Sequence, residues 1–342
     1  MIIVQEAFSC KNVYEAYLKA RRGKRHRVET IKFEINALEN VYLIAYQLQK
    51  KIYQTKGYEV FKVYEPKERI IMAPPFADRV VQHCLCDNIL APRLTKHFIY
   101  DTYACLKGKG THAGLNRLRE FLQRYYRKYG LNGWILKGDI KKFFYSINHE
   151  FLKASLYPLL KDDDIYWLTD QIIDSTPNPG LPLGNQSSQW FANFYLSGFD
   201  HFVKEKLRVK LYIRYMDDFV LILPTKKEAK QCLITIEQYL WEHLRLETNQ
   251  KTQIFPIKNG VDFLGFHTYV SGTGKVIRKL RRNSKQRMRR KLKKFKEFYL
   301  TGEMSAKDIE RSFQSWKGHA QHGNCYRLIE TMEGVYDDIF RR

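Results

Sequence analysis

The sequence predicts a mixed α/β (α+β) fold that ends in a basic helical region. Two observations indicate this class. Short apolar runs rich in β-branched and aromatic residues alternate with helical patterns as far as residue 266, and the pattern after residue 275 is helical and basic. The chain has 342 residues, 44% apolar and 14% aromatic, which is enough for a packed core and two or three subdomains.

The charge balance favours a polyanionic partner. The 59 Lys and Arg residues outnumber the 36 Asp and Glu residues, and the net charge of +23 is typical of nucleic-acid binding. An anionic membrane surface is the alternative, but apolar runs such as 219–223 are far shorter than the roughly 20 residues of a spanning helix. The N-terminus does not read as a secretory signal, and the six cysteines lack zinc-ligand spacing. We therefore expect a cytoplasmic protein with reduced thiols and no membrane contact.

Helical periodicity and strand alternation predict the N-terminal elements: a helix at 9–20, strands within 58–72, and a helix at 76–91. The turn between the two strands carries the cations Lys67 and Arg69. A basic, glycine-containing loop at 107–112 opens the next helix. Such a loop suits a phosphate at a helix N-terminus, although it lacks the spacing of a P-loop.

The central region is predicted to alternate strands and helices: a buried strand at 134–140, an aromatic-rich helix after the turn at 180–184, a hairpin at 211–223, and a helix at 226–243. The hairpin is assigned because two apolar runs flank Tyr215-Met216-Asp217-Asp218. Phe263-Leu264-Gly265-Phe266 is expected to end the mixed α/β region.

The segment 275–300 is predicted to be a basic helix. Residues 275–300 carry thirteen Lys or Arg and one acid, Glu297. Apolar residues recur at helical spacing at Leu280, Met288, Leu292, Phe295 and Tyr299. This pattern indicates an amphipathic helix with a basic outer face.

Three carboxylates stand out in this basic chain. Asp139 ends one predicted strand, and Asp217 and Asp218 lie at the tip of the hairpin. Carboxylates held by apolar strands are costly unless a cation pairs with them, and magnesium prefers carboxylate oxygens. If adjacent strands bring the three together, they form a site for metal-assisted phosphoryl transfer. An ordinary acidic turn is the alternative.

These residues and several others resemble a reverse transcriptase. The Arg69 strand and Asp78-Arg79-Val80-Val81-Gln82 resemble the finger blocks of bacterial and group II intron enzymes. Asp139-Ile140-Lys141-Lys142-Phe143-Phe144 resembles the first palm motif, and Tyr215-Met216-Asp217-Asp218 resembles the signature catalytic box. Lys251-Thr252 and Phe263-Leu264-Gly265-Phe266 resemble later palm blocks, so the matching blocks follow the expected order.

A narrower resemblance lies in Leu183-Gly184-Asn185-Gln186-Ser187-Ser188-Gln189. An aliphatic-Gly start with a Ser-Gln end resembles the enzymes of diversity-generating retroelements. Glu65 to Arg69, Tyr103 to Cys105 and Gly108 to His112 resemble the same group, whereas Leu106 departs from the Arg expected there. The resemblance implies error-prone copying of a template-repeat RNA, with errors at adenines, and a small basic accessory protein that forms a ring. It also implies a bacterial, archaeal or phage-encoded protein.

The resemblance implies a role for each matching residue. Asp139, Asp217 and Asp218 would hold two Mg²⁺ ions, with the Ile140 carbonyl assisting. Lys67 and Arg69 would contact the incoming deoxynucleoside triphosphate; a solvated hairpin is the alternative.

Further implied roles concern the nucleotide and the primer. Phe144 would exclude a ribose 2′-OH, unless it is a plain core aromatic. Gly184 and Gln189 would lie where templating base and nucleotide meet. Tyr215 and Met216 would pack near the primer end or simply within the hairpin, and Lys251 would serve as general acid for pyrophosphate or remain a surface lysine.

The basic C-terminal segment would grip the RNA/DNA duplex through its phosphates. The predicted nucleic-acid-binding residues are Arg281, Arg282, Lys285, Arg289, Arg290 and Lys293.

The implied architecture is a right-hand polymerase, with fingers at 1–130, a palm with an RRM-like antiparallel sheet at 131–270 and a helical thumb at 271–342. The implied reaction is RNA-templated addition of deoxynucleotides to a primer. A retron or group II intron enzyme is one alternative, although intron enzymes usually carry a maturase domain beyond the thumb. A non-catalytic RNA-binding protein on a polymerase scaffold is the alternative of a different class.

Overall fold

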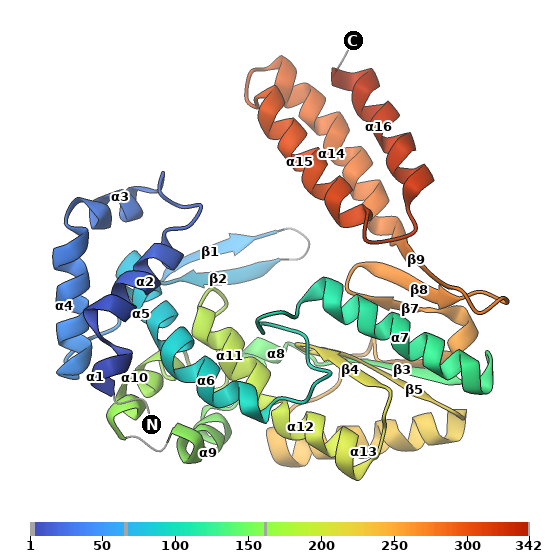
Figure 1. Cartoon of the computed structure of the whole chain (residues 1–342), viewed down its shortest axis with the longest axis horizontal. Coiled ribbons are helices and arrows are strands. Elements are labelled where there is room, and N and C mark those ends of the chain that lie inside the picture. Colours follow the sequence, from blue (N-terminus) through green and yellow to red (C-terminus); the bar gives the residue numbers. More distant parts are fainter. Residues whose placement is uncertain (1–3, 65–67, 161–162, 341–342) are drawn as a thin grey trace. The chain divides into compact units, whose positions relative to one another are not determined.

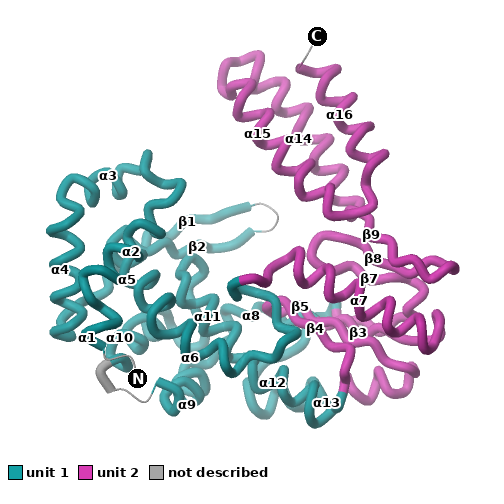
Figure 2. Tube along the Cα trace, viewed as in Figure 1, with its two compact units in different colours: residues 1–107, 139–208, 234–251 teal, residues 108–138, 209–233, 252–342 magenta. Residues whose placement is uncertain are grey.

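The computed structural model describes residues 4–64, 68–160 and 163–340. The chain divides into two compact units, each assembled from separated stretches of sequence (Figure 2). Unit 1 comprises residues 1–107, 139–208 and 234–251, and unit 2 comprises residues 108–138, 209–233 and 252–342. The chain therefore passes between the units several times, and Asp139 is the first residue after one of these passages.

Unit 1 is mainly helical and carries one hairpin (Figure 1). Its elements are α1 (Val4–Ala7), α2 (Cys10–Ala20), α3 (Val28–Ile35), α4 (Ala37–Gln49), β1 (Glu59–Val63), β2 (Arg69–Ala73), α5 (Phe76–Leu85), α6 (Ala91–Leu94), α8 (Phe143–Ser146), α9 (His149–Leu160), α10 (Asp163–Ile173), α11 (Gln186–Tyr195) and α12 (Ser197–His201). Ser9 caps α2 by accepting a hydrogen bond from the Asn12 amide at 3.4 Å. The predicted helix at 76–91 changes to a π-helix at Cys86–Leu90.

Unit 2 contains two antiparallel sheets and a helical bundle. Its elements are α7 (Thr111–Tyr129), β3 (Trp134–Asp139), β4 (Tyr212–Tyr215), β5 (Asp218–Leu223), β6 (Gln253–Pro256), β7 (Val261–Phe263), β8 (Phe266–Val270), β9 (Val276–Leu280), α14 (Arg282–Leu300), α15 (Ala306–Ala320) and α16 (Tyr326–Phe340), with α13 (Lys226–Leu244) running from unit 2 into unit 1. The larger sheet has the strand order β4-β5-β3-β6, so β5 and β3 are central neighbours. Of the predicted acids, Asp139 ends β3 and Asp218 begins β5, and Asp217 lies in the turn before β5.

The smaller sheet corrects the prediction for residues 275–300. The mixed α/β region does not end at Phe266, because β8 and β9 follow it. Leu280 belongs to β9 rather than to a helix, and α14 begins only at Arg282. Side-chain exposure alternates with the period of a strand. Val276, Arg278 and Leu280 are buried, and the residues between them are more exposed. A buried arginine in this strand concealed the period-two pattern in the sequence.

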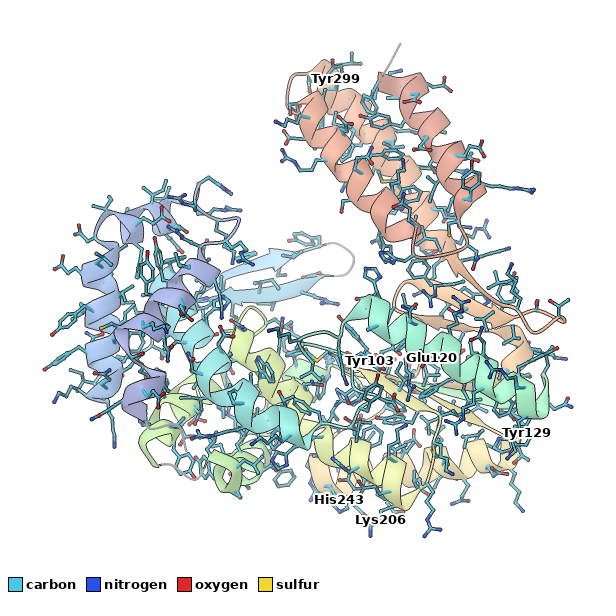
Figure 3. The ribbon with its side chains drawn as sticks, in the orientation of Figure 1. Tyr103, Glu120, Tyr129, Lys206, His243 and Tyr299 are labelled. Carbon is cyan, nitrogen blue, oxygen red and sulfur yellow. The ribbon has the colours of Figure 1, made fainter. Side chains whose placement is uncertain are left out.

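The three C-terminal helices form a bundle with its own apolar core. Met288 and Leu292 of α14 pack with Ile309 and Phe313 of α15 and with Met332 of α16. Tyr299 lies at the end of α14 (Figure 3). Its ring meets Phe340 of α16 edge-on, with 6.1 Å between centroids. The basic residues of α14 are left on its outside, as an amphipathic helix requires. None of the described helices combines the length and apolar character needed to cross a membrane.

Candidate active site

The hairpin β4–β5 presents the Asp217-Asp218 pair on a two-residue turn. Tyr215 pairs with Asp218 across the ladder, which leaves Met216 and Asp217 as the turn. Met216 has φ of +54°, a region that side chains other than glycine adopt rarely. Backbone strain of this kind persists only where neighbouring structure enforces it, and it concentrates at functional sites.

Arg214 enforces the turn from inside the sheet. It is fully buried, and its Nη1 donates a hydrogen bond to the Met216 carbonyl oxygen at 2.9 Å. A buried guanidinium is tolerated only when hydrogen bonds satisfy it. The sequence prediction did not assign Arg214 a role. The available signal was a cation in the otherwise apolar β4 run, directly before the two acids.

A lysine from the neighbouring strand faces Asp218. Lys137 Nζ lies 3.5 Å from Asp218 Oδ1, and the two side chains are 25% and 26% exposed. The Lys137 ammonium offsets part of the Asp218 charge and would compete with a bound cation. Carboxylate oxygens are the donors that hard divalent ions prefer, so the adjacent Asp217 and Asp218 side chains fit a magnesium ion. Lys137 is a further residue that the sequence prediction missed.

Gly138 allows β3 to approach β5 closely. A Cβ atom at this position would collide with the ring of Phe219, the residue after Asp218. The aromatic ring therefore packs directly over the β3 backbone. This contact explains a glycine immediately before Asp139, because any side chain would force the two acid-bearing strands apart.

Asp139 belongs to unit 1. Its carbonyl oxygen accepts a hydrogen bond from the Asn249 amide at 2.6 Å, and the next residue, Ile140, is buried and forms a bridge with Thr248. Lys251 is exposed, and its amide donates to Asn249 Oδ1 at 3.1 Å. The segment that carries the predicted general acid thus runs alongside the segment that carries Asp139.

The predicted nucleotide residues Arg69, Phe144 and Gly184 also lie in unit 1, where hydrogen bonds connect their segments. The Met72 amide of β2 donates to the Leu183 carbonyl at 2.7 Å, and the Leu181 amide donates to the Phe144 carbonyl at 2.7 Å. The loop before α11 therefore joins β2 to α8.

Gly184 has φ of +138°, and a Cβ there would strike the Met72 carbonyl, so glycine is required. Arg69 is exposed on β2 and Phe144 is half-buried. Lys67 lies outside the described residues.

Gln189 is held by a cysteine that the sequence prediction did not link to it. The Cys105 thiol donates a hydrogen bond to Gln189 Oε1 at 3.2 Å. Cys105 has φ of +57°, and burial raises the pKa of its thiol to about 11. The thiol therefore stays protonated near neutral pH and remains a donor. Gln189 is exposed, and with its oxygen engaged its amide keeps two N–H groups for other acceptors.

The predicted metal ligands are distributed over both units: Asp217 and Asp218 belong to unit 2 and Asp139 to unit 1. Across residues 4–64, 68–160 and 163–340, no cluster of three or more His, Cys, Asp or Glu side chains is spaced to hold a metal ion. The adjacent carboxylates of Asp217 and Asp218 supply oxygen donors that fit magnesium. The three-carboxylate centre remains a proposal.

The predicted nucleic-acid contacts lie at the start and on the outer face of α14. Arg282, Arg289, Arg290 and Lys293 are exposed, and Lys285 is half-buried. Arg281 precedes the helix, and its Nε lies 3.0 Å from Asp262 Oδ2. This ion pair engages part of the Arg281 charge, whereas the exposed α14 cations stay accessible to phosphate.

Comparison with known proteins identifies the family. The sequence profile of the family named reverse transcriptase (RNA-dependent DNA polymerase) matches residues 60–268, more than half of the chain. The chain therefore belongs to the reverse transcriptase family.

Protein YkfC of Escherichia coli (strain K12) is 23% identical over 250 residues, which cover 60% of this chain and 65% of that protein. The chain thus spans less than two thirds of this relative.

Solved structures support the fold class. A telomerase from Candida albicans, in complex with a fragment of telomeric RNA, has a TM-score of 0.52 at 14% identity, covering 69% of this chain and 46% of that chain. The apo telomerase of Candida tropicalis has a TM-score of 0.50 at 15% identity, covering 65% and 48%. The chain spans about half the length of these telomerases. At such low identity the likeness shows the fold alone, a mixed α/β reverse transcriptase fold.

Proposed function

We propose that this chain is an RNA-directed DNA polymerase that extends a primer 3′-OH with deoxynucleotides. The observation that carries the proposal is the Asp217-Asp218 turn, held at a positive φ by the buried Arg214. It lies within residues 60–268, which match the reverse transcriptase family. A turn of this kind costs stability, and a catalytic role accounts for its presence.

Strand alternation supports a role for Asp139 with the doublet. Residues two apart in a strand project to the same face. Asp139 therefore shares a face of β3 with Lys137, whose ammonium group faces Asp218. In our proposal Asp139, Asp217 and Asp218 hold two Mg²⁺ ions, with the Ile140 carbonyl as a further oxygen donor.

Bound magnesium would neutralise the triphosphate and lower the pKa of the attacking hydroxyl. Side chains of the protein bind the substrate, select it and supply a proton. Lys67 and Arg69 bind the triphosphate, and Phe144 excludes a ribose 2′-OH. Lys251 donates a proton to the departing pyrophosphate. Phosphoryl transfer needs this positioning and charge neutralisation more than covalent chemistry from the protein.

The subfamily is a further part of the proposal. We assign the chain to the diversity-generating retroelement group on the block from Leu183 to Gln189. In this assignment it copies a template-repeat RNA with errors at adenines, together with a small basic accessory protein, in a cytoplasmic setting. The constraint on Gly184 and the engaged oxygen of Gln189 support a specialised nucleotide pocket. A retron or intron-type enzyme would lack adenine-directed errors.

Primer extension on an RNA template tests the activity. Wild-type protein is compared with Asp217→Ala and Asp218→Ala in the presence of magnesium. We expect the wild type to extend the primer. The extension rate should fall by at least roughly 10³-fold in either variant, because each variant lacks a carboxylate ligand of the charge-neutralising magnesium. Equal activity in all three proteins would contradict the catalytic assignment of the two aspartates, and no activity in wild type would favour a non-catalytic RNA-binding protein. Sequencing of the products for adenine-directed errors tests the subfamily.

A further inference from the structure

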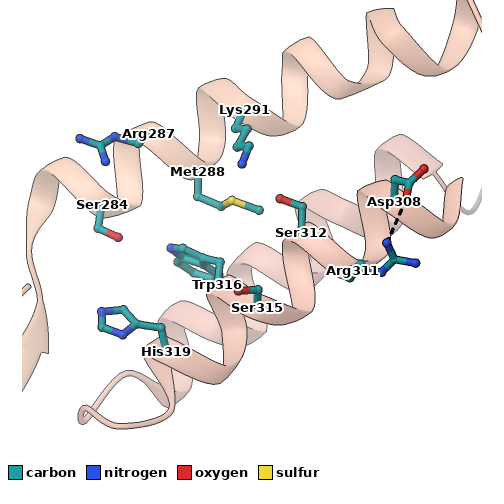
Figure 4. Close-up of a pocket in the computed structure, with 10 residues that line it drawn as sticks. All are labelled: Ser284, Arg287, Met288, Lys291, Asp308, Arg311, Ser312, Ser315, Trp316 and His319. Carbon is teal, nitrogen blue, oxygen red and sulfur yellow. Dashed lines mark hydrogen bonds and ion pairs between the residues drawn. The ribbon is translucent and has the colours of Figure 1, made fainter. Parts of the chain in front are cut away.

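A basic groove runs between α14 and α15 in the C-terminal bundle (Figure 4). It has a volume of about 590 Å³. Arg287 and Lys291 line it from α14, and Arg311 lines it from α15. None of these three cations is among the six residues that the sequence predicts to contact nucleic acid. The groove is therefore a second basic surface on the same bundle.

The charges in the groove are suited to a polyanion. Arg287 and Lys291 are exposed. Asp308 is the acid at the groove; it lies 3.2 Å from Arg311, whose side chain is 70% exposed. Asp308 also accepts a hydrogen bond from Ser305 at 2.6 Å, so its charge is shared between two partners. The three cations leave a net positive charge available to phosphates.

Polar and aromatic groups complete the groove. Ser284, Ser312 and Ser315 add hydroxyl groups along its walls. The Trp316 indole lies at the groove, stacks on Phe313 at 5.9 Å, and is half-buried. Its N–H is buried and finds no hydrogen-bond acceptor within the described part of the chain. Surfaces that bind single-stranded nucleic acid combine cations along the phosphate backbone with aromatic rings that stack on the bases.

The composition of the groove favours a single strand over a duplex. A single strand exposes its base faces as well as its phosphates, so the cations and the Trp316 ring can contact it together. In a duplex the base faces are stacked on one another and cannot reach an aromatic side chain. The outer face of α14, with Arg289, Arg290 and Lys293, remains available to a duplex.

We propose that the groove between α14 and α15 binds a single-stranded nucleic acid, with phosphates on Arg287, Lys291 and Arg311. This inference rests on the proposed function, because a template-copying enzyme handles an unpaired strand beside its duplex. RNA and DNA share the phosphate chemistry. The serine hydroxyls can contact a ribose 2′-OH, so RNA is the favoured strand.

The test measures binding of three fluorescent probes to the full chain by anisotropy: a single-stranded RNA, a DNA of the same sequence, and a blunt RNA/DNA duplex. The groove variant is Arg287→Ala, Lys291→Ala and Arg311→Ala together. The matched control removes three cations of the same bundle that lie outside the groove and outside the predicted set: Lys296→Ala, Lys307→Ala and Arg327→Ala. Thermal melting checks that both variants fold.

The groove variant is expected to lose at least about tenfold in affinity for single-stranded RNA. Its salt dependence should also weaken, by roughly 0.7 in log–log slope for each phosphate that the variant no longer neutralises. The control is expected to change affinity by less than about threefold. A tighter RNA than DNA complex would indicate that the serine hydroxyls bind the ribose, and equal affinities would leave phosphate recognition as the shared chemistry.

Two results overturn the proposal. Equal losses in the groove variant and the control would mean that affinity follows total charge. A loss confined to the duplex probe would mean that the groove belongs to the duplex site. Primer extension by the control variant, run in parallel, reports separately on the proposed polymerase activity.

Discussion

Arg214 and Lys137 place positive charge around the Asp217-Asp218 turn. Arg214 fixes the backbone at Met216, and Lys137 faces Asp218 across the sheet. The sequence alone predicted the hairpin and its acids, because apolar strands flank a short polar turn. It could not predict Lys137, since the register between β3 and β5 depends on strand pairing rather than on local pattern.

Gly138 sets the spacing of the two central strands, and its substitution gives a residue-scale prediction. Gly138→Ala is expected to destabilise the protein by about 1–3 kcal/mol, because the new methyl group overpacks against the Phe219 ring. Denaturant unfolding measures this change. In the background of Phe219→Leu, which shortens the opposing side chain, the cost of the same substitution should be smaller. An equal cost in both backgrounds would show that the ring is not the obstacle.

The hydrogen bond from Cys105 to Gln189 gives a second prediction at this scale. Cys105→Ala removes the donor and should alter the error spectrum of the copied DNA, because the Gln189 amide is free to rotate. Cys105→Ser keeps a donor and should retain the wild-type spectrum. Sequencing of primer-extension products measures both. An unchanged spectrum in the alanine variant would contradict a positioning role for the thiol.

At the element scale, a histidine cluster joins α7 to the C-terminal bundle within unit 2. The His112 ring of α7 stacks on His322 with 3.4 Å between centroids, and His319 of α15 lies 6.4 Å from His112. Arg278 of β9 faces the same cluster and donates to the His322 carbonyl at 3.0 Å. Burial, the neighbouring histidines and, for His112, Arg278 lower the pKa of His112 and of His319.

These lowered pKa values predict a loss of stability in mild acid. A histidine whose folded pKa lies below its ordinary value of 6.5 binds its proton more readily when unfolded, so stability falls as the pH drops through about 6.5. Thermal melting at about pH 7.5 and about pH 5.5 should show a lower midpoint in acid. His112→Gln should reduce this difference, because it removes one member of the repelling group. A variant with the wild-type pH response would contradict the assignment.

The element boundaries show where sequence patterns are sufficient. Helix α2 and the Tyr215–Asp218 hairpin were predicted because local signals agree with the final packing. Strand β9 was missed because Arg278 resembles a solvated helix residue. In the structure, its Nη2 donates to the Leu115 carbonyl of α7 at 2.6 Å. A buried cation whose hydrogen-bond acceptor lies on a helix far away in the chain gives no signal in the sequence around it.

At the scale of the whole molecule, the net charge of +23 and the membership of the reverse transcriptase family both favour the proposed nucleic-acid partner. Composition predicted nucleic acid, and the order of the sequence blocks predicted the reverse transcriptase family. The division into two interleaved units was not predicted, because it depends on which distant segments pack together.

The basic face of α14 predicts a strong salt dependence of duplex binding. If the six predicted residues, Arg281 before the helix and five within α14, each contact one phosphate, the log–log slope of affinity against salt should be about −5. Replacing Arg289, Arg290 and Lys293 by alanine should reduce the magnitude of that slope by roughly 3. Anisotropy titrations with an RNA/DNA duplex measure both slopes. An unchanged slope in the triple variant would place the duplex elsewhere.

We propose that Asp139 acts with Asp217 and Asp218 as one magnesium-binding unit. Single-turnover primer extension with Asp139→Asn, Asp218→Asn and the double variant tests this proposal. We expect losses of at least roughly 10³-fold in each single variant and little further loss in the double variant, because residues that act as a unit are not additive. An Asp139→Asn protein that extends the primer within about tenfold of wild type, beside an inactive Asp218→Asn protein, would contradict the claim.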